Sequence, residues 1–432
     1  MERKIIILLL CAVGFTVSAY AWAVSPTLLV RGELVTEYSA TAELQFLRST
    51  VNKAIETNPE FAAQKASAES ARAKLEGAGL PLYNPSLAVE VARAEDNTLA
   101  LGLTQTLDWH DKQLGQQALQ QVEVDISNAE LTQLIMSLAT HVLNAMADYY
   151  NALEMSGLHK KRVMLLEQIV QIAEKRLAAG DINKSEVLLA RLSLADAVID
   201  HARQSANVIE AQKSFFILSQ QQITAAPAFV MPLPDGIGDD VNLDELARRH
   251  PLEKIALLRV ELSKREVTSV NRERRADPEL GFKVGKEGED ALVGVEFSMP
   301  WQVRNNLSST VKVAQKTQLQ TEFQAQHTHR RIMADIKAAK SQYHLIAKAW
   351  KVWLSNGENQ LKEHIELLEQ RWNSGELSTT DYLVQLEQNL HTQIAGVELK
   401  GSVWRTWFQW LNATAQVLVW LTLDEDYLIN TD

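Results

Sequence analysis

The sequence predicts a mainly α-helical protein with a small β part, built from two copies of a helix–β-hairpin–long helix–helix unit. Three observations support this fold class: an internal repeat, two pairs of short segments in which apolar residues alternate, and two very long helical segments. In the repeat, Gly102 returns as Gly294 after 192 residues, and Gly180 returns as Gly375 after 195 residues. Because a long repeat decides the architecture, we expect two fused copies of one unit.

The N-terminal segment 1–23 predicts a secretory signal peptide. Two basic residues precede an apolar stretch at 5–17, which is too short to span a bilayer. Cleavage sites of the small-x-small type end at Ala21 and Ala23, and a signal anchor is the alternative. The single cysteine, Cys11, lies in this segment. The mature chain is therefore expected to have no disulfide and no thiolate metal site.

The composition excludes some partners. The formal net charge of −11 argues against a nucleic-acid-binding protein and against attraction to anionic lipid. After the signal segment, no stretch approaches the 18 or so consecutive apolar residues that predict a transmembrane helix.

The first copy covers residues 24–222. Its opening segment is rich in Ala, Glu, Lys and Gln, which favour helix, and Pro81 and Pro85 end that segment. A later helical pattern stops at Gly180, because glycine tolerates the positive φ of a helix C-terminus. The predicted elements are a helix at about 41–79, strands at 86–93 and 98–107, a long helix at about 110–178, a turn near 180 and a helix at about 183–220.

The second copy covers residues 241–415. A linker rich in proline and glycine precedes it at 223–240, and a C-terminal tail follows it at 416–432. The predicted elements of this copy are a helix at about 242–275, strands at 279–286 and 291–299, a long helix at about 306–373, a turn near 375 and a return helix at about 378–415.

The two long helical segments have almost equal lengths. Trp109 to Gly180 spans 71 positions and Trp301 to Gly375 spans 74. At 1.5 Å per residue each would be about 100 Å long, which exceeds a globular helix and indicates a coiled coil or helical array. Each begins at a hairpin and ends at a glycine turn, which suggests that the two helices form one long cylinder wall.

Apolar and polar residues alternate in the four predicted strands. In the first strand, Leu87 and Val89 share one face, and Glu90 lies on the other. This pattern fits a transmembrane barrel with a water-filled lumen, and it equally fits a half-buried sheet in a soluble protein. In a barrel, Glu90, Lys283 and Glu296 would line the lumen.

A membrane barrel made from this chain would need several copies. Lipid does not tolerate open sheet edges, and single-chain bacterial barrels have at least eight strands. Two copies of this chain would supply eight strands and three copies would supply twelve. The short connections at 93–97 and 286–290 would lie on one side of the membrane and the long helices on the other.

Together these features resemble the TolC family of outer-membrane efflux proteins. The match covers about residues 42–415, and its most specific motif is an Arg-x-x-x-Gly turn in each copy, followed six residues later by an acidic residue. Asn58-Pro59-Glu60 is similar to the heavy-metal, CzcC-like branch. The other matching residues are the strand starts Pro85-Ser86-Leu87 and Pro278-Glu279-Leu280, the turns Arg176 to Gly180 and Arg371 to Gly375, and the acidic residues Glu186 and Asp381.

The resemblance implies a homotrimer in the bacterial outer membrane with a large periplasmic portion. Twelve strands would form one barrel, and twelve helices would form a periplasmic α-helical barrel closed at its far tip. The tip would dock on a periplasmic adaptor (membrane fusion) protein and an inner-membrane pump of the RND type. The chain would be the passive channel of a tripartite efflux system, with no cofactor, and the CzcC-like branch suggests heavy-metal cations as cargo.

By the same resemblance, the two Arg-x-x-x-Gly turns lie at the periplasmic tip. Asp381 is a candidate for a carboxylate ring at the channel constriction, and capping or pairing within the return helix is the alternative role. Where the family often has a second Asp, this chain has Val384. The expected adaptor contacts are Arg176, Gly180, Glu186, Arg371, Gly375 and Asp381.

No enzymatic, cofactor or metal site is expected. The segment from Gly281 to Lys286 resembles a phosphate loop, but it lacks a Ser or Thr after the lysine and lies on a predicted strand. His327 and His329 would point about 200° apart on a helix, so they cannot share a small ion. No nucleophile is gathered with a base and oxyanion donors.

Two alternatives remain at this stage. A function from another class is a soluble periplasmic coiled-coil adaptor or scaffold. The second alternative concerns Trp350, Trp353, Trp404 and Trp407, which are spaced for helix faces. Their expected role is packing, and the alternative role is an aromatic belt at a membrane interface.

Overall fold

The computed structural model describes most of the chain after residue 41. The predicted signal segment 1–23 lies outside the described residues, as does most of the predicted linker 223–240. All described residues belong to one compact unit, Ala40–Asp432. The described ranges are 42–93, 97–222, 229, 233–234, 236–238, 240–302 and 304–423.

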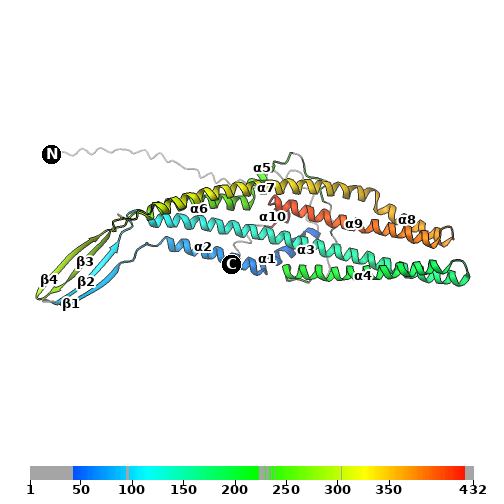
Figure 1. Cartoon of the computed structure of the whole chain (residues 1–432), viewed down its shortest axis with the longest axis horizontal. Helices are drawn as coiled ribbons and strands as arrows, with labels where there is room; N and C mark the ends of the chain where they lie inside the picture. Colours follow the sequence, from blue (N-terminus) through cyan, green and yellow to red (C-terminus); the bar gives the residue numbers. More distant parts are fainter. Residues whose placement is uncertain are drawn as a thin grey trace, which may run out of the picture. The chain divides into compact units, whose positions relative to one another are not determined.

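This unit is mainly helical with one small antiparallel sheet, as the sequence predicts. Figure 1 shows the sheet at one end of the long helices and the α3–α4 turn at the other end of α3. The elements are α1 (Ala42–Glu56), α2 (Pro59–Ala78), β1 (Ser86–Arg93), β2 (Asn97–Thr106), α3 (Lys112–Ala179), α4 (Lys184–Ser219), α5 (Leu243–Arg249), α6 (Pro251–Glu273), β3 (Glu279–Glu287), β4 (Asp290–Ser298), α7 (Ser308–Asn356), α8 (Glu358–Asn373), α9 (Thr379–Ala413) and α10 (Val417–Trp420).

The two hairpins join into one sheet. Its strands run in the order β1-β2-β3-β4, and every neighbouring pair is antiparallel. In the centre of the sheet, Leu101 of β2 pairs with Val89 of β1 and with Val284 of β3. Val284 pairs in turn with Val293 of β4. The register therefore brings the apolar faces of all four strands together on one side of the sheet, as predicted.

This apolar face is exposed. Its twelve large side chains have exposed fractions between 41 and 79%, and no described helix contacts the sheet extensively. We call this set the apolar sheet face. Its members are Leu87, Val89, Val91, Leu99, Leu101, Leu103, Leu280, Phe282, Val284, Val293, Val295 and Phe297.

The opposite face of the sheet is crowded and lined by small residues. Gly285 pairs with Ala100, which is buried. A Cβ atom at Gly285 would lie 2.3 Å from the carbonyl oxygen of Leu99 and 2.6 Å from Cβ of Ala100. At Gly281 an added Cβ would lie 3.1 Å from Cβ of Glu296. Small residues therefore let the strands lie close together on this face.

Two of the predicted helices are divided near their start. The segment predicted at 41–79 breaks between α1 and α2, where the Asn58 side chain accepts hydrogen bonds from the backbone N–H groups of Glu60 (2.7 Å) and Phe61 (3.3 Å). The segment predicted at 242–275 breaks between α5 and α6 at His250. Both breaks precede a proline, whose missing N–H suits the first helical position and interrupts a preceding helix.

The helix predicted at 306–373 is also divided, into α7 and α8. The break is at Gly357, where an added Cβ would lie 2.6 Å from Cε3 of Trp353. On the facing helix α9, a Cβ at Gly396 would lie 2.1 Å from Cζ2 of the same indole. The bulky indole of Trp353 therefore occupies space that only glycine leaves open. At Gly357, α7 ends and α8 begins.

The long helix α3 contacts most of the other helices. It packs against α2 and α6 towards the sheet, and against α4 and α9 towards the turn. Trp404 and Trp407 of α9 are buried in the core, which agrees with their predicted packing role. The segment predicted as a tail begins with α10, in which the buried Val417 and Leu418 add to this core. None of the described helices combines the length and apolar character that a membrane span requires.

A buried ion pair joins the two copies where the sheet meets the helices. Lys112 Nζ, at the start of α3, lies 2.8 Å from Asp277 Oδ2, and both side chains are largely buried. The Tyr83 hydroxyl donates a hydrogen bond of 2.7 Å to the same oxygen. Burial alone would raise the pKa of Asp277, but the bonds from Lys112 and Tyr83 outweigh it and the pKa is lowered. Asp277 is therefore ionised in the folded protein near neutral pH.

Replacing Lys112 by methionine should destabilise the protein by about 3 kcal/mol, because it leaves the buried Asp277 carboxylate without its cation. Thermal unfolding of the purified protein measures this loss. The double variant Lys112→Met/Asp277→Asn removes both charges and should recover most of the stability. Equal destabilisation in the single and double variants would contradict a charge-based role for the pair.

Candidate functional site: the paired helical turns

The turn after α3 is built by local backbone chemistry. Gly180 has φ of 83°. Its N–H donates to the Leu177 carbonyl (3.0 Å), and the Asp181 N–H donates to the Arg176 carbonyl (2.9 Å). This is the Schellman pattern of a helix C-terminus, in which a positive φ favours glycine. The positive φ predicted for Gly180 is confirmed.

The turn after α8 repeats the same pattern. Gly375 has φ of 80°. Its N–H donates to the Trp372 carbonyl (3.2 Å), and the Glu376 N–H donates to the Arg371 carbonyl (3.0 Å). The spacing of Arg-x-x-x-Gly therefore reflects one turn geometry used twice. In both turns the backbone carbonyl of the arginine completes the C-terminal hydrogen bonds.

The acidic residues of the motif begin the return helices. The Asn183 side chain accepts from the Glu186 N–H (3.1 Å) and donates to Glu186 Oε1 (3.0 Å). In the second turn, Ser378 Oγ accepts from the Asp381 N–H (3.1 Å) and donates to Asp381 Oδ2 (2.7 Å). Asn183 and Ser378 are therefore the N-caps of α4 and α9, and the acidic residue three positions later pairs with the side chain of the cap. The structure thus shows Asp381 paired within the return helix.

The two arginines do different things with their side chains. Arg176 reaches the second turn, where Nη2 donates to the Trp372 carbonyl (2.8 Å) and the guanidinium lies 5.0 Å from the centroid of the Trp372 ring. Arg371 is exposed, and its Nε lies 3.8 Å from Glu376 Oε2. Arg176 therefore ties the two turns together, whereas Arg371 makes only a long ion pair within its own turn.

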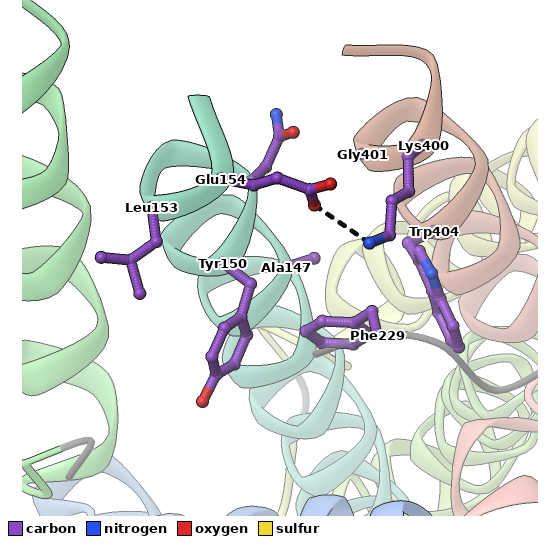
Figure 2. A pocket seen from close by; sticks show the side chains of 9 residues that line it. Ala147, Tyr150, Leu153, Glu154, Phe229, Lys400, Gly401 and Trp404 are labelled. Carbon is purple, nitrogen blue, oxygen red and sulfur yellow. Dashed lines mark hydrogen bonds and ion pairs between the residues drawn. The ribbon is translucent and has the colours of Figure 1, made fainter. Parts of the chain in front are cut away.

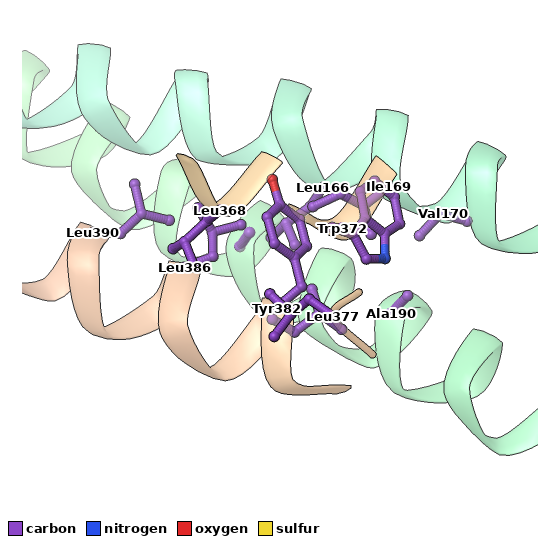
Figure 3. Close-up of a cluster of buried hydrophobic side chains, with 12 residues drawn as sticks. Leu166, Ile169, Val170, Ala190, Leu368, Trp372, Leu377, Tyr382, Leu386 and Leu390 are labelled. Carbon is purple, nitrogen blue, oxygen red and sulfur yellow. The ribbon is translucent and has the colours of Figure 1, made fainter. Parts of the chain in front are cut away.

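An aromatic cluster supports this contact from inside. Trp372 and Tyr382 are stacked, with ring centroids 4.7 Å apart and planes within 3° of each other. Figure 3 shows them between Leu166 and Ile169 of α3 and the leucines of α8 and α9. Because both rings are buried, the second turn and the start of α9 are held against α3 and α4.

A buried arginine earlier in α3, Arg162, contacts three carboxylates. Arg162 is 5% exposed, and its guanidinium lies 2.9 Å from Asp200, 3.1 Å from Asp196 and 2.8 Å from Glu387. This network links α3 to α4 and α9. This network was not predicted from the sequence, although Asp196 and Asp200, four residues apart on one helix face, would repel each other without a cation.

His159 lies buried one turn before Arg162, and its Nδ1 has no hydrogen-bond partner. Burial lowers its pKa, and this outweighs the opposing effect of Asp200. Glu387 also raises the pKa of His159, while Arg162 and His201 lower it. His159 is therefore neutral in the folded protein at pH 7.

The residues predicted to line a lumen share one face of the sheet. Lys283 Nζ forms an ion pair with Glu90 Oε2 across β2. Glu296 of β4 pairs with Gly281 and lies on the same side. This small-residue face therefore carries both signs of charge, opposite the apolar sheet face.

A pocket of about 350 Å³ lies between α3 and α9 (Figure 2). Phe229 packs edge-on against Tyr150, with centroids 5.5 Å apart, and against Trp404, with centroids 4.8 Å apart. At its rim, Lys400 Nζ lies 3.0 Å from Glu154 Oε2. Its nine lining residues include no serine, threonine, cysteine or histidine. Phe229 lines this pocket between helices of the two copies.

Among the residues that the structure describes, no three or more His, Cys, Asp or Glu side chains form a cluster that could hold a metal ion. His329 Nδ1 lies 3.1 Å from Glu253 Oε1. That contact joins α7 to α6.

Comparison with known proteins identifies the fold. The sequence matches no family model and no curated protein. The structure is similar to the CmeC outer membrane channel of Campylobacter jejuni (17% identity, 86% of this chain and 85% of that chain, TM-score 0.72). It is also similar to the outer membrane protein VceC of Vibrio cholerae (16%, 86% and 96%, 0.71) and to the open MtrE outer membrane channel of Neisseria gonorrhoeae (16%, 86% and 89%, 0.71). The chain therefore has the fold of these outer membrane channels.

Replacing Gly180 or Gly375 by alanine should destabilise the protein by about 1 kcal/mol each, because alanine is strained at positive φ. No atom lies within 4 Å of an added Cβ at either position, so backbone strain is the only cost. Gly157, inside α3, has equally open surroundings, and Gly157→Ala should instead stabilise by about 0.5–1 kcal/mol. Thermal unfolding measures all three. Stabilisation by all three variants would contradict the assigned turn geometry.

The free energy of unfolding should fall as the pH drops below about 6.5, because the unfolded chain then binds a proton that the buried His159 does not bind. Above that pH the imidazole is neutral in both states and its contribution is complete. The loss is about 1.4 kcal/mol for each pH unit between 6.5 and the lower folded pKa. In thermal melts at pH 7.5 and 5.5, His159→Gln should reduce this pH dependence and the exposed His141→Gln should not. Equal pH dependence of stability in His159→Gln and in the parent protein would contradict its assignment to His159.

Proposed function

We propose that this chain belongs to the TolC family and forms the trimeric outer-membrane channel of a tripartite efflux system. The observation that carries this proposal is the apolar sheet face. Twelve large apolar side chains stand exposed on one side of an open four-stranded sheet, and charged and small residues occupy the other side. A sheet exposed in this way to water would be an aggregation site, whereas lipid would cover it favourably.

Closure of the sheet supports the trimer. In a bilayer the unpaired edges of β1 and β4 would leave backbone N–H and C=O groups without partners, so the edges must pair with other copies. Three copies provide twelve strands. The small-residue face, opposite the apolar sheet face, would become the inside of the barrel, and the Glu90, Lys283 and Glu296 side chains would meet water there.

The helical part supports a continued water-filled conduit. A polar groove of about 610 Å³ lies between α2, α3, α6 and α7, and most of its lining residues carry hydroxyl, amide or charged groups. Glu130 and Arg259 form an ion pair of 2.8 Å at this groove. A helical surface lined by polar groups in this way is suited to face the interior of an α-helical barrel, because polar cargo and water can pass along it.

The paired turns would form the periplasmic tip. We propose that Arg176, Gly180, Glu186, Arg371, Gly375 and Asp381 form the surface that meets a periplasmic adaptor, which in turn joins an inner-membrane pump of the RND type. The exposed Arg371 is available for such a contact. Asp381 is proposed to contribute a ring of three carboxylates at the constriction in addition to its hydrogen bond with Ser378, the N-cap of α9.

The cargo assignment has weaker support than the conduit. Heavy-metal export rests on the resemblance of Asn58-Pro59-Glu60 to one branch of the family. The structure gives this motif a local role, since Asn58 caps α2 and Pro59 occupies its first position. A soluble periplasmic scaffold, the alternative function, would leave the apolar sheet face exposed to water.

Two neighbouring residues on opposite faces of β4 test the channel. Val295→Arg places a charge on the apolar sheet face and should cost about 2–4 kcal/mol in lipid, so membrane insertion is lost. Glu296→Arg places the same side chain on the other face and should leave insertion intact, while shifting ion selectivity towards anions. The measurements are particle mass in detergent, recovery in liposomes and ion selectivity in planar bilayers. A parent protein that is a water-soluble monomer, or two variants that insert equally well, would contradict the proposal.

A further inference from the structure

The pocket between α3 and α9 plays no part in the proposed passage through the channel. Its volume of about 350 Å³ lies at the lower end of the range for small-molecule sites, about 300–1,000 Å³. Helix α3 supplies one wall and α9 supplies the other, and Phe229 lies between them (Figure 2). All of these residues belong to one chain, so the pocket is formed without a partner.

Aromatic rings form the apolar part of the pocket. The Phe229 ring packs edge-on against Tyr150 and Trp404, and Ala147 and Leu153 extend the same surface. Figure 2 shows the Tyr150 hydroxyl pointing away from the Phe229 ring, so Tyr150 adds an aromatic surface to the lining. A lining of aromatic and aliphatic groups with a few polar ones is typical of sites that bind small molecules.

Two charged residues complete the lining. Figure 2 shows the ion pair between Lys400 and Glu154 above the Phe229 ring. The side chains are 21% and 44% exposed, so a molecule from solvent can reach both. Burial raises the pKa of Tyr150 to about 12, and its hydroxyl is therefore uncharged at pH 7. Lys400 and Glu154 are thus the two charges of the pocket, one of each sign.

A neutral amide lies beside the ion pair. Asn151 is one turn before Glu154 on α3, and its amide lies against Gly401 of α9. A Cβ atom at Gly401 would lie 2.8 Å from both Cγ and Nδ2 of Asn151. Because glycine leaves this space open, the amide lies between the two helices, where it offers a hydrogen-bond donor and an acceptor.

The ion pair decides which kind of ligand fits. A ligand with a single charge would pair with Lys400 or with Glu154 and leave the other one without its partner at a partly buried position, which costs free energy. A ligand with both charges would pair with both residues. An aromatic ring on the same molecule would pack against Phe229 and Trp404, because edge-to-face contacts between rings are favourable.

We propose that this pocket binds a small aromatic zwitterion of the α-amino acid class. The ligand carboxylate would accept hydrogen bonds from Lys400 and Asn151, its ammonium group would donate to Glu154, and its ring would fill the apolar part. For a ligand of about twelve non-hydrogen atoms we expect a dissociation constant of about 1 mM or below. This inference goes beyond the proposed channel and does not depend on it, because every contact lies within one chain.

Binding of L-phenylalanine to the purified protein tests the inference. Equilibrium dialysis with the radiolabelled amino acid should show saturable binding. 2-Phenylethylamine lacks the carboxylate and 3-phenylpropionate lacks the ammonium group, and each should bind at least about tenfold more weakly. L-Alanine lacks the ring and should be weaker by about tenfold or more. No saturable binding of L-phenylalanine, or equal binding of all four compounds, would overturn the inference.

Two charge variants test the assigned contacts. Glu154→Gln frees Lys400, so 3-phenylpropionate should become a better ligand than 2-phenylethylamine, and Lys400→Met should reverse this order because it frees Glu154. Each variant should weaken L-phenylalanine binding about tenfold. The matched control Glu174→Gln breaks the exposed ion pair with Arg191 and should leave all affinities unchanged.

Two results of this series would overturn the site. One is the same order of ligands in both charge variants, and the other is an equal loss of affinity in the control. The result also stands apart from the channel proposal. A water-soluble monomer that shows these preferences would support the site and contradict the channel, whereas a trimeric channel without binding would overturn the site alone.

Discussion

The burial of one helix along its whole length organises the described structure. The 68 residues of α3 would make a helix about 100 Å long, and a helix gains most of its stability from the packing of its apolar side. Buried residues occur along α3 from Val122 to Ala173. They pack against α2 and α6 near the sheet and against α4 and α9 near the turns. The sheet and the turns are therefore held at opposite ends of one continuous core.

The two copies share the backbone geometry of their turns but differ in their side-chain contacts. Both turns use the same positive-φ glycine, the same two carbonyl bonds and the same kind of helix cap. Their arginines have diverged, since Arg176 spans the two turns while Arg371 remains exposed. A duplicated backbone can thus keep its geometry while one copy provides an internal tie and the other presents a charge to the surroundings.

The sequence predicts the parts of the fold that depend on local patterns. Alternation sets the two faces of the strands, and glycine at positive φ ends α3 and α8, so both follow from short segments. The break at Gly357 was missed because it depends on Trp353 fitting against Gly396, which lies on a different helix. The motif Asn58-Pro59 is a helix-start signal, although it was interpreted above only as part of the family resemblance.

In the candidate site, too, the features set by short segments were predicted and those set by distant contacts were not. The motif residues at the turns were identified from spacing, and the structure explains that spacing by helix capping. Arg162 was missed because Glu387 is 225 residues away in the sequence, and Lys112 was missed because Asp277 is 165 residues away. Glu387 and Asp277 come from the other repeat, and no local pattern indicates which charges will meet across the two repeats.

The close approach of Gly285 and Ala100 has a consequence for assembly. A side chain at position 285 would collide with the carbonyl oxygen of Leu99, so the two hairpins are joined by a close backbone contact made within one chain. The conformational entropy of joining the hairpins is therefore lost during folding of the single chain and not during association with a partner. A bulkier residue at position 285 would push β3 away from β2 and weaken the junction of the two hairpins.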